Sequence, residues 1–384
     1  MNHERLIKRS TIIEGRLAGN LFCTVAINKD ENLIGCGCGQ AYLKQAGCVA
    51  LSAGVTDIFA ISNNGTVIYR SLVPYDYEAN LIPHYAFDTV VSKYGAKHVS
   101  RSGMVVAASY RSGSVSVGGY PEANEDDAIM WSDIDDIICF SDGIAGLTKS
   151  GTVLLCGNGA VPYLEMTNWT NIARLKAIPS YLGCFAVSGF VGLKKDGTLL
   201  YCGKDHEFGS HISRYKDVVS FDGCFLGEKV KEFYAVKSDG SVYMYMYFHE
   251  NDVVPTIDTD QYKKDCIAVK YLPSGPHFIK KDGTLETVPL KMNFPDHIQE
   301  ALVIQTGRKY DVVQQALKNA AEHPLAEQVT GWKLFNDPDE VLRRYEGFED
   351  GSFERNGKCL YCGGTLKGFF TKKCTVCGKS KDFF

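Results

Sequence analysis

Four cysteines near the C-terminal end have a spacing that suits metal binding. They form two Cys-x-x-Cys pairs, each followed by glycine: Cys359 with Cys362 and, after eleven residues, Cys374 with Cys377. Each tight turn aims two thiolates at a common centre, and four thiolates make the tetrahedron that Zn²⁺ accepts. Because such a shell is closed, the predicted zinc is structural and not catalytic. Iron in the same geometry, or a redox dithiol pair, is the alternative.

The stretch 359–377 resembles zinc ribbons in general. A unit of about 30 residues buries too little core to fold alone, so its folding is expected to depend on the metal. Residues 353–384 carry seven Lys or Arg against two acids. We expect these cations to form a solvated surface and not a nucleic-acid contact, because they are spread along the segment and not gathered on one face.

The rest of the chain shows no catalytic motif. It has no phosphate-binding Gly-x-x-x-x-Gly-Lys-Ser/Thr, no nucleophile elbow and no His-Glu-x-x-His, and its nine histidines are scattered. The sequence therefore predicts a protein that is not an enzyme. A site assembled in a central channel from distant segments is the open alternative.

One hairpin pattern recurs along most of the chain. Its clearest copy is residues 190–203, in which an alternating apolar stretch is followed by Lys195-Asp-Gly-Thr198 and a second extended stretch. Asp-Gly suits a tight turn, because glycine adopts positive φ without a Cβ clash. Seven copies align with their turn positions at residues 31, 65, 113, 151, 197, 240 and 283. In the first, Glu31 stands where the others have glycine, and Asn32 is expected to carry the left-handed conformation.

Repeats of this length, about 42 residues, suit one four-stranded sheet each and predict an all-β propeller. The pattern Leu-Lys-Lys-Asp-Gly-Thr-Leu-Leu-Tyr-Cys-Gly, with Trp169-x-x-Ile172 before it, resembles repeats of the regulator-of-chromosome-condensation family over residues 20–290. The resemblance implies seven blades, but it says little about nucleotide exchange, since fold does not determine function. Repeats of this size are also similar to those of a bacterial propeller that inhibits β-lactamases by protein contact.

The predicted domain order follows from these patterns. Residues 1–19 form an N-terminal segment, in which Leu6–Ile13 is expected to be an extended strand that closes the ring. Residues 20–300 form the seven-bladed propeller, 301–356 a helical linker, and 357–384 the Cys₄ zinc ribbon. In the linker, one helix is predicted over 311–322 and a second from the Asp337 cap to about Tyr345.

Ten of the fourteen cysteines lie in the repeats, and several keep the repeat register. Cys36, Cys156 and Cys202 each follow the turn position by five residues, so they are expected to be small buried side chains in a reducing compartment. Cys36-Gly-Cys38 could instead hold a metal or form a redox pair. No signal peptide or apolar stretch of about 20 residues is present, so a cytoplasmic protein without a membrane span is expected.

The sixth repeat continues as Val242-Tyr-Met-Tyr-Met-Tyr-Phe248, which places Tyr243, Tyr245 and Tyr247 on one face of a strand. Tyrosine-rich faces suit protein recognition, although a packed strand between blades explains the pattern too.

The leading hypothesis is a non-enzymatic scaffold or regulator that binds a protein partner through one propeller face. The alternatives are an enzyme regulator, either an inhibitor or a guanine-nucleotide exchange factor, and nucleic-acid binding through the ribbon. The net charge of −4, with a body more acidic than its C-terminal end, argues against a wide nucleic-acid surface.

Overall fold

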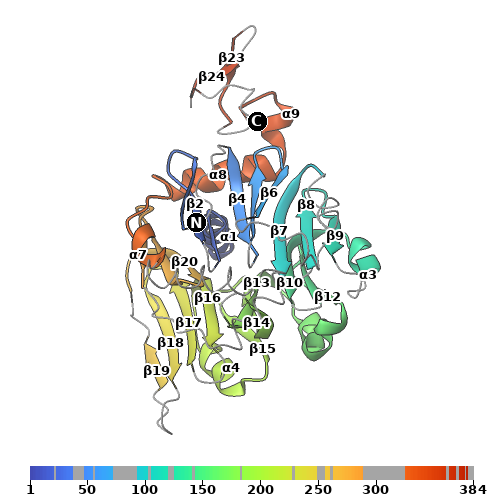
Figure 1. The fold of residues 1–384 in the computed structure, drawn as a ribbon, viewed down its shortest axis with the longest axis vertical. Helices are drawn as coiled ribbons and strands as arrows, with labels where there is room; N and C mark the ends of the chain where they lie inside the picture. The colour runs from blue at the N-terminus through green and yellow to red at the C-terminus, as the bar shows by residue number, and fades with distance from the viewer. Residues whose placement is uncertain are drawn as a thin grey trace, which may run out of the picture.

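The computed structural model describes residues 1–20, 23–37, 47–54, 57–71, 93–102, 105–119, 125–140, 143–181, 184–226, 230–248, 256–259, 263–288, 325–359, 363–368, 372–376 and 378. In these residues the strands form seven antiparallel sheets of three or four strands and one two-stranded sheet. Each of the seven contacts the next, and the seventh contacts the first (Figure 1). A closed ring of small sheets is a β-propeller.

Consecutive strands make up each sheet. The first three sheets are β1 (Leu17–Gly19), β2 (Cys23–Ile27) and β3 (Leu33–Gly37); β4 (Cys48–Ala53), β5 (Asp57–Ser62) and β6 (Val67–Ser71); and β7 (Ala96–Ser102), β8 (Val105–Tyr110) and β9 (Val115–Gly119). The fourth and fifth are β10 (Ile134–Phe140), β11 (Gly143–Thr148) and β12 (Val153–Cys156); and β13 (Ile172–Tyr181), β14 (Cys184–Lys194) and β15 (Leu199–Gly203). The sixth has four strands, β16 (Val218–Leu226), β17 (Val230–Lys237), β18 (Val242–Phe248) and β19 (Thr256–Thr259), and the seventh is β20 (Cys266–Leu272), β21 (Gly275–Lys280) and β22 (Leu285–Thr287).

The seven predicted hairpins are confirmed as β2–β3, β5–β6, β8–β9, β11–β12, β14–β15, β17–β18 and β21–β22. In the first of them the left-handed residue is Glu31, with φ of 62°, so the assignment of that conformation to Asn32 is wrong. The turn geometry explains the difference. The Glu31 amide donates to the carbonyl three residues earlier, that of Asn28, and the turn glycines of the later hairpins make the same bond.

Each turn glycine also joins its sheet to the next one. The Gly113 carbonyl accepts a hydrogen bond from the amide of Ile134, the first residue of the following sheet, and the same bond links Gly65 to Ala96, Gly151 to Ile172, Gly197 to Val218 and Gly240 to Cys266. At Gly65 the turn favours glycine for two reasons. Its φ is positive, and a Cβ at Gly65 would lie 2.4 Å from the Cα of Gly95.

The N-terminal segment is a helix inside the ring, so the predicted ring-closing strand over Leu6–Ile13 is wrong. Helix α1 (His3–Glu14) begins at Asn2, whose side chain caps the Arg5 amide, and it contacts β13, β16 and β20 at the centre of the ring (Figure 1). The β-branched residues here suggested a strand, yet Ile7 and Ile13 also match a helical face, and both are buried against the sheets.

The ring is closed by a segment that follows the last sheet. The Leu334 amide donates to the Gly283 carbonyl of the seventh sheet, and the Lys333 carbonyl accepts from the Lys29 amide of the first. The first of these bonds repeats the link from a turn glycine to the next sheet. The second repeats a bond that is made within each of the other sheets. Lys333 and Leu334 therefore supply the residues that the first sheet lacks at its start.

The three tryptophans of the chain occupy equivalent positions just before a junction between two sheets. Trp131, Trp169 and Trp332 each precede the linking residue, and each amide bonds the carbonyl three residues earlier. Trp131 and Trp169 pack against apolar clusters that contain residues of two adjacent sheets, so each lies between neighbouring blades. Short helices at the rim precede the three tryptophans, α3 (Glu125–Ile129), η2 (Asn158–Asn168) and α7 (Leu325–Val329), and α4 (His206–Ile212) precedes Tyr215 in the same way.

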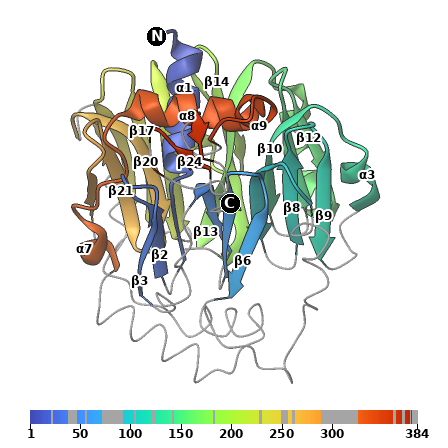
Figure 2. The ribbon, with the colours of Figure 1, turned by 90° about the horizontal axis from the view of Figure 1, so that it is seen from above.

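The helix predicted from Asp337 is confirmed as α8 (Pro338–Glu349), which extends four residues beyond the predicted end. It lies across one face of the ring and packs on α1, so this part of the predicted linker is fixed to the propeller (Figure 2). The helix predicted over 311–322 lies outside the described residues. After α8 come α9 (Ser352–Arg355) and the pair β23 (Leu366–Lys367) and β24 (Lys373–Cys374). None of the described helices meets the length and apolarity that a bilayer span requires.

The repeat cysteines lie in the core, as predicted. Cys36, Cys156 and Cys202 are buried free thiols. Burial raises the pKa of Cys36 and Cys156 to about 11 and that of Cys202 to about 12, so these thiols stay protonated and unreactive at neutral pH. Cys38 lies outside the described residues.

A matched pair of glycines tests the packing of the turn. Gly65 and Gly95 have the same positive φ, but a Cβ at Gly95 would meet no atom within 4 Å. In chemical denaturation, Gly95→Ala should lower the free energy of unfolding by about 1 kcal/mol from backbone strain alone, and Gly65→Ala by about 2–4 kcal/mol because a clash is added. Equal losses would show that the close approach between sheets does not matter.

Candidate functional sites

The channel side of the ring is lined by two layers of side chains. Inner strands β4, β7, β10, β13, β16 and β20 each contain a bulge near their start, at the same place in every sheet. The first layer consists of the third residue of each of these strands: Ala50, His98, Asp136, Arg174, Ser220 and Ala268. The second layer consists of the fifth residue: Ser52, Ser100, Ile138, Lys176, Asp222 and Lys270. Charge in the second layer is therefore confined to the fifth, sixth and seventh sheets, which α1 contacts.

Glu14 at the end of α1 is the centre of the ion network on that side. Both of its carboxylate oxygens accept from Arg174 at 2.6 Å, and Lys176 and Ser220 add bonds of 2.7 and 2.6 Å. Burial by itself would raise the pKa of Glu14, but Arg174 and Lys176 outweigh it and hold the pKa below its ordinary value. The carboxylate is thus ionised, and it fixes α1 inside the channel.

A second cluster joins α8 to the opposite wall. The Lys97 amine, 2% exposed, lies 2.6 Å from Asp135 and 2.5 Å from Glu349, and Lys8 of α1 also bonds Glu349. Burial opposes the charged amine, but the two carboxylates raise the pKa of Lys97 above its usual value. Every charge in this cluster has a partner, as buried charges require.

His98 and Asp136 form the pair in the channel that could move a proton. The Nδ1 atom of His98 lies 3.5 Å from an Asp136 oxygen, which also accepts from the Ile137 amide. A carboxylate beside imidazole orients the ring and stabilises its charged form. Within the described part of the chain, no further hydrogen bond of His98 connects the pair to a nucleophile.

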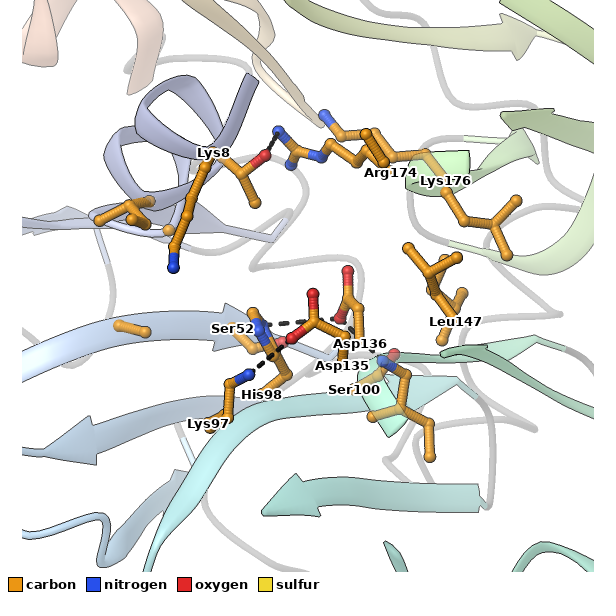
Figure 3. A pocket seen from close by; sticks show the side chains of 18 of the residues that line it. Lys8, Ser52, Lys97, His98, Ser100, Asp135, Asp136, Leu147, Arg174 and Lys176 are labelled. Atoms are coloured by element: carbon orange, nitrogen blue, oxygen red, sulfur yellow. Dashed lines mark hydrogen bonds and ion pairs between the residues drawn. The ribbon is translucent and has the colours of Figure 1, made fainter. Parts of the chain in front are cut away.

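These groups surround a cavity of about 590 Å³ between α1 and the inner strands. In Figure 3, Lys8 extends from α1 on one side, Arg174 and Lys176 lie beside it, and Lys97, His98 and the two aspartates face them. Tyr345 and Glu349 of α8 contribute to the lining. The volume suits a small molecule.

At the C-terminal end, the structure brings Cys359 and Cys374 together, whereas Cys362 and Cys377 lie outside the described residues. Both described cysteines are buried, and a Cβ at Gly364 would lie 2.7 Å from the Cys374 sulfur. The two turns match. Gly363 bonds the Cys359 carbonyl and Gly378 that of Cys374, each with positive φ, and the Val376 amide donates to the Cys374 sulfur. Paired turns with an amide directed at sulfur fit thiolate ligands.

The three tyrosines of β18 differ in exposure. Tyr245 is fully buried against Phe208, so it offers no surface to a partner in this conformation. Tyr243 stacks on Tyr215 with ring centroids 4.3 Å apart, and Tyr247 lies under the Lys231 amine. Tyr243 and Tyr247 are only partly buried, and their role in binding stays a prediction.

Sequence reasoning missed the channel residues, although a signal was present. In Ile172-Ala-Arg-Leu-Lys-Ala177, charged residues alternate with apolar ones on the strand that opens a repeat. An inner strand has one face toward the channel, so charge in these slots marks the channel lining.

Comparisons with known proteins give no family. No family model and no curated protein matches the chain in sequence. Among solved structures, the BP39L lectin from Burkholderia pseudomallei is similar at 13% identity and a TM-score of 0.47, over 73% of this chain and 97% of that one. Prp20p from Saccharomyces cerevisiae gives 13% and 0.41, over 63% and 76%, and the CRINKLY WD40 ectodomain of the Arabidopsis thaliana receptor kinase ACR4 gives 10% and 0.40, over 65% and 97%. Similarity at this level carries no functional argument, and the assignment of the fold depends on the ring of sheets itself.

The role of Glu14 can be tested against a second glutamate of the same helix. Glu14→Gln leaves Arg174 and Lys176 short of a buried counter-charge and should lower the free energy of unfolding by about 3–5 kcal/mol in urea. Glu4 pairs with Lys195 at the surface, so Glu4→Gln should cost at most about 1 kcal/mol. A small loss for Glu14→Gln would mean that the apolar face of α1 is sufficient to hold it.

Proposed function

We propose that this protein is a non-enzymatic interaction module, a propeller of seven blades of the regulator-of-chromosome-condensation type that binds a protein partner and carries a C-terminal zinc ribbon. The observation that supports it is the use made of the channel. Glu14, Asp135, Asp222 and Glu349 are all bound to cations of the same chain, and α1 occupies the space where side chains of the sheets converge. In this proposal, groups engaged in this way have a structural role.

The ribbon is a second contact module in this proposal. Cys359, Cys362, Cys374 and Cys377 would hold one Zn²⁺, which supplies the stability that so small a unit lacks. It is joined to the propeller through Phe353, whose ring packs against Gly347 of α8 and Gly363 of the first cysteine turn. A reducing compartment such as the cytoplasm suits both the zinc thiolates and the buried free thiols of the repeats.

Binding and turnover can be separated experimentally. The purified full chain should capture a specific protein from cells of its source, and it should show no hydrolase or lyase turnover of its own on generic ester, phosphate and glycoside substrates. Turnover that disappears in both His98→Ala and Asp136→Ala, while folding is kept, would overturn the proposal in favour of a channel enzyme. Capture that persists with Tyr247→Ala would place the partner elsewhere than on β18.

Metal removal tests the ribbon. Elemental analysis should give about one zinc per chain, and Cys374→Ser should lose that metal and the ordered fold of residues 357–384, because one thiolate of four is gone. Cys202→Ser is the matched control, since Cys202 lies in the propeller core, and it should keep the zinc. Chelation should leave thermal unfolding of the propeller nearly unchanged. Loss of propeller structure on chelation would instead show that repeat cysteines hold metal.

A further inference from the structure

Among the residues that the structure describes, the Lys270 amine of the channel network has no ion-pair partner. Asp222 accepts from Lys176, from the Tyr271 amide and from its neighbour Gly223, and both oxygens of Glu14 are taken by Arg174, Lys176 and Ser220. Within the described ranges, Lys270 donates its one hydrogen bond to the main-chain carbonyl of Glu14, at 3.2 Å. A carbonyl is a hydrogen-bond acceptor and carries no full negative charge.

The surroundings of Lys270 are of mixed charge and largely buried. It faces Arg174 and Lys176 on β13, Asp222 on β16, Glu14 on α1 and His277 on β21. Burial, and then the neighbouring Lys176, lower the pKa of Lys270 to about 8. Its side chain nevertheless lines the cavity, so this amine is within reach of a molecule in the channel.

The cavity as a whole favours negative charge. Cations outnumber carboxylates among its lining residues: Lys8, Lys97, Lys149, Arg174, Lys176, Lys195 and Lys270 against Glu4, Asp135, Asp136, Asp222 and Glu349. In the layer of Lys270, the second, third and fourth sheets contribute Ser52, Ser100 and Ile138. Two hydroxyls and an apolar side chain can accommodate a small polar ligand without opposing its charge.

We propose that the channel cavity binds a small anion, a carboxylate or phosphate compound, and that Lys270 is its principal charged contact. The ligand supplies an ion-pair partner that the described residues do not, and its binding favours the protonated amine. Anion binding does not depend on the proposed protein partner, so either proposal can fail without the other.

Calorimetry on the full chain with succinate and with inorganic phosphate, at ionic strength matched with sodium chloride, tests the site and distinguishes the two anions. Saturable binding is expected at pH 7. Succinate is fully ionised from pH 7 to 9, so its affinity should fall about tenfold over that range as Lys270 loses its proton. No saturable binding of either anion, or an affinity for succinate that does not change with pH, would overturn the proposal.

Variants identify the contact. Lys270→Met should weaken binding by about tenfold or more, whereas Lys281→Met should stay within about twofold, since Lys281 lies on the exposed turn of the same sheet. Lys270→Arg keeps the charge and cannot lose its proton in this range, so it should still bind and should lose the pH dependence. Equal weakening in Lys270→Met and Lys281→Met, or a pH dependence that persists in Lys270→Arg, would assign the anion to another site.

Discussion

The hydrogen bond between a turn glycine and the first residue of the next sheet is the interaction on which the ring depends. It sets the position of each inner strand relative to the hairpin before it, for example Ile172 at the Gly151 carbonyl. Because the same bond recurs at each described junction from Gly65 onward, the inner strands face the channel in one register. Side chains at equivalent positions then form layers, and the chemistry of the channel follows from which residues fill each slot.

In the second layer, charged side chains lie on one side of the channel only. The fifth, sixth and seventh sheets place Lys176, Asp222 and Lys270 at one level, and the second, third and fourth place Ser52, Ser100 and Ile138 there. Helix α1 lies on the charged side, where Glu14 meets Arg174 and Lys176. Outside this layer the opposite wall of the cavity is charged too, since Lys97, His98, Asp135 and Asp136 line it.

The turns were predictable from the sequence because their cause is local. A glycine with positive φ at a close approach leaves a direct signature, and even the exception, Glu31, was aligned correctly. The place of α1 was not predictable in this way, since Glu14 and Arg174 are 160 residues apart and neither has a local signal for the other. The closing segment was missed although Trp332 repeats the position of Trp131 and Trp169. Its spacing to Leu334 is one residue shorter than in the other copies, so alignment on the hairpins alone passed over it. Cys359 and Cys374 were identified by spacing, which is again a local property.

The position of the closing pair has a consequence for synthesis of the chain on the ribosome. Lys333 and Leu334 follow the last turn glycine, Gly283, by about 50 residues, and they complete a sheet that begins at Leu17. The first sheet can therefore be completed only after nearly the whole chain has been synthesised. In the closed ring the outer edge of β22 bonds Trp332 and Gly331, and this edge stays unpaired until they are made. We expect the nascent protein to pass through an open arc of sheets, with an unpaired strand edge at each end. A chain that stops early, just beyond the seventh hairpin, would have all seven hairpins but no closed ring.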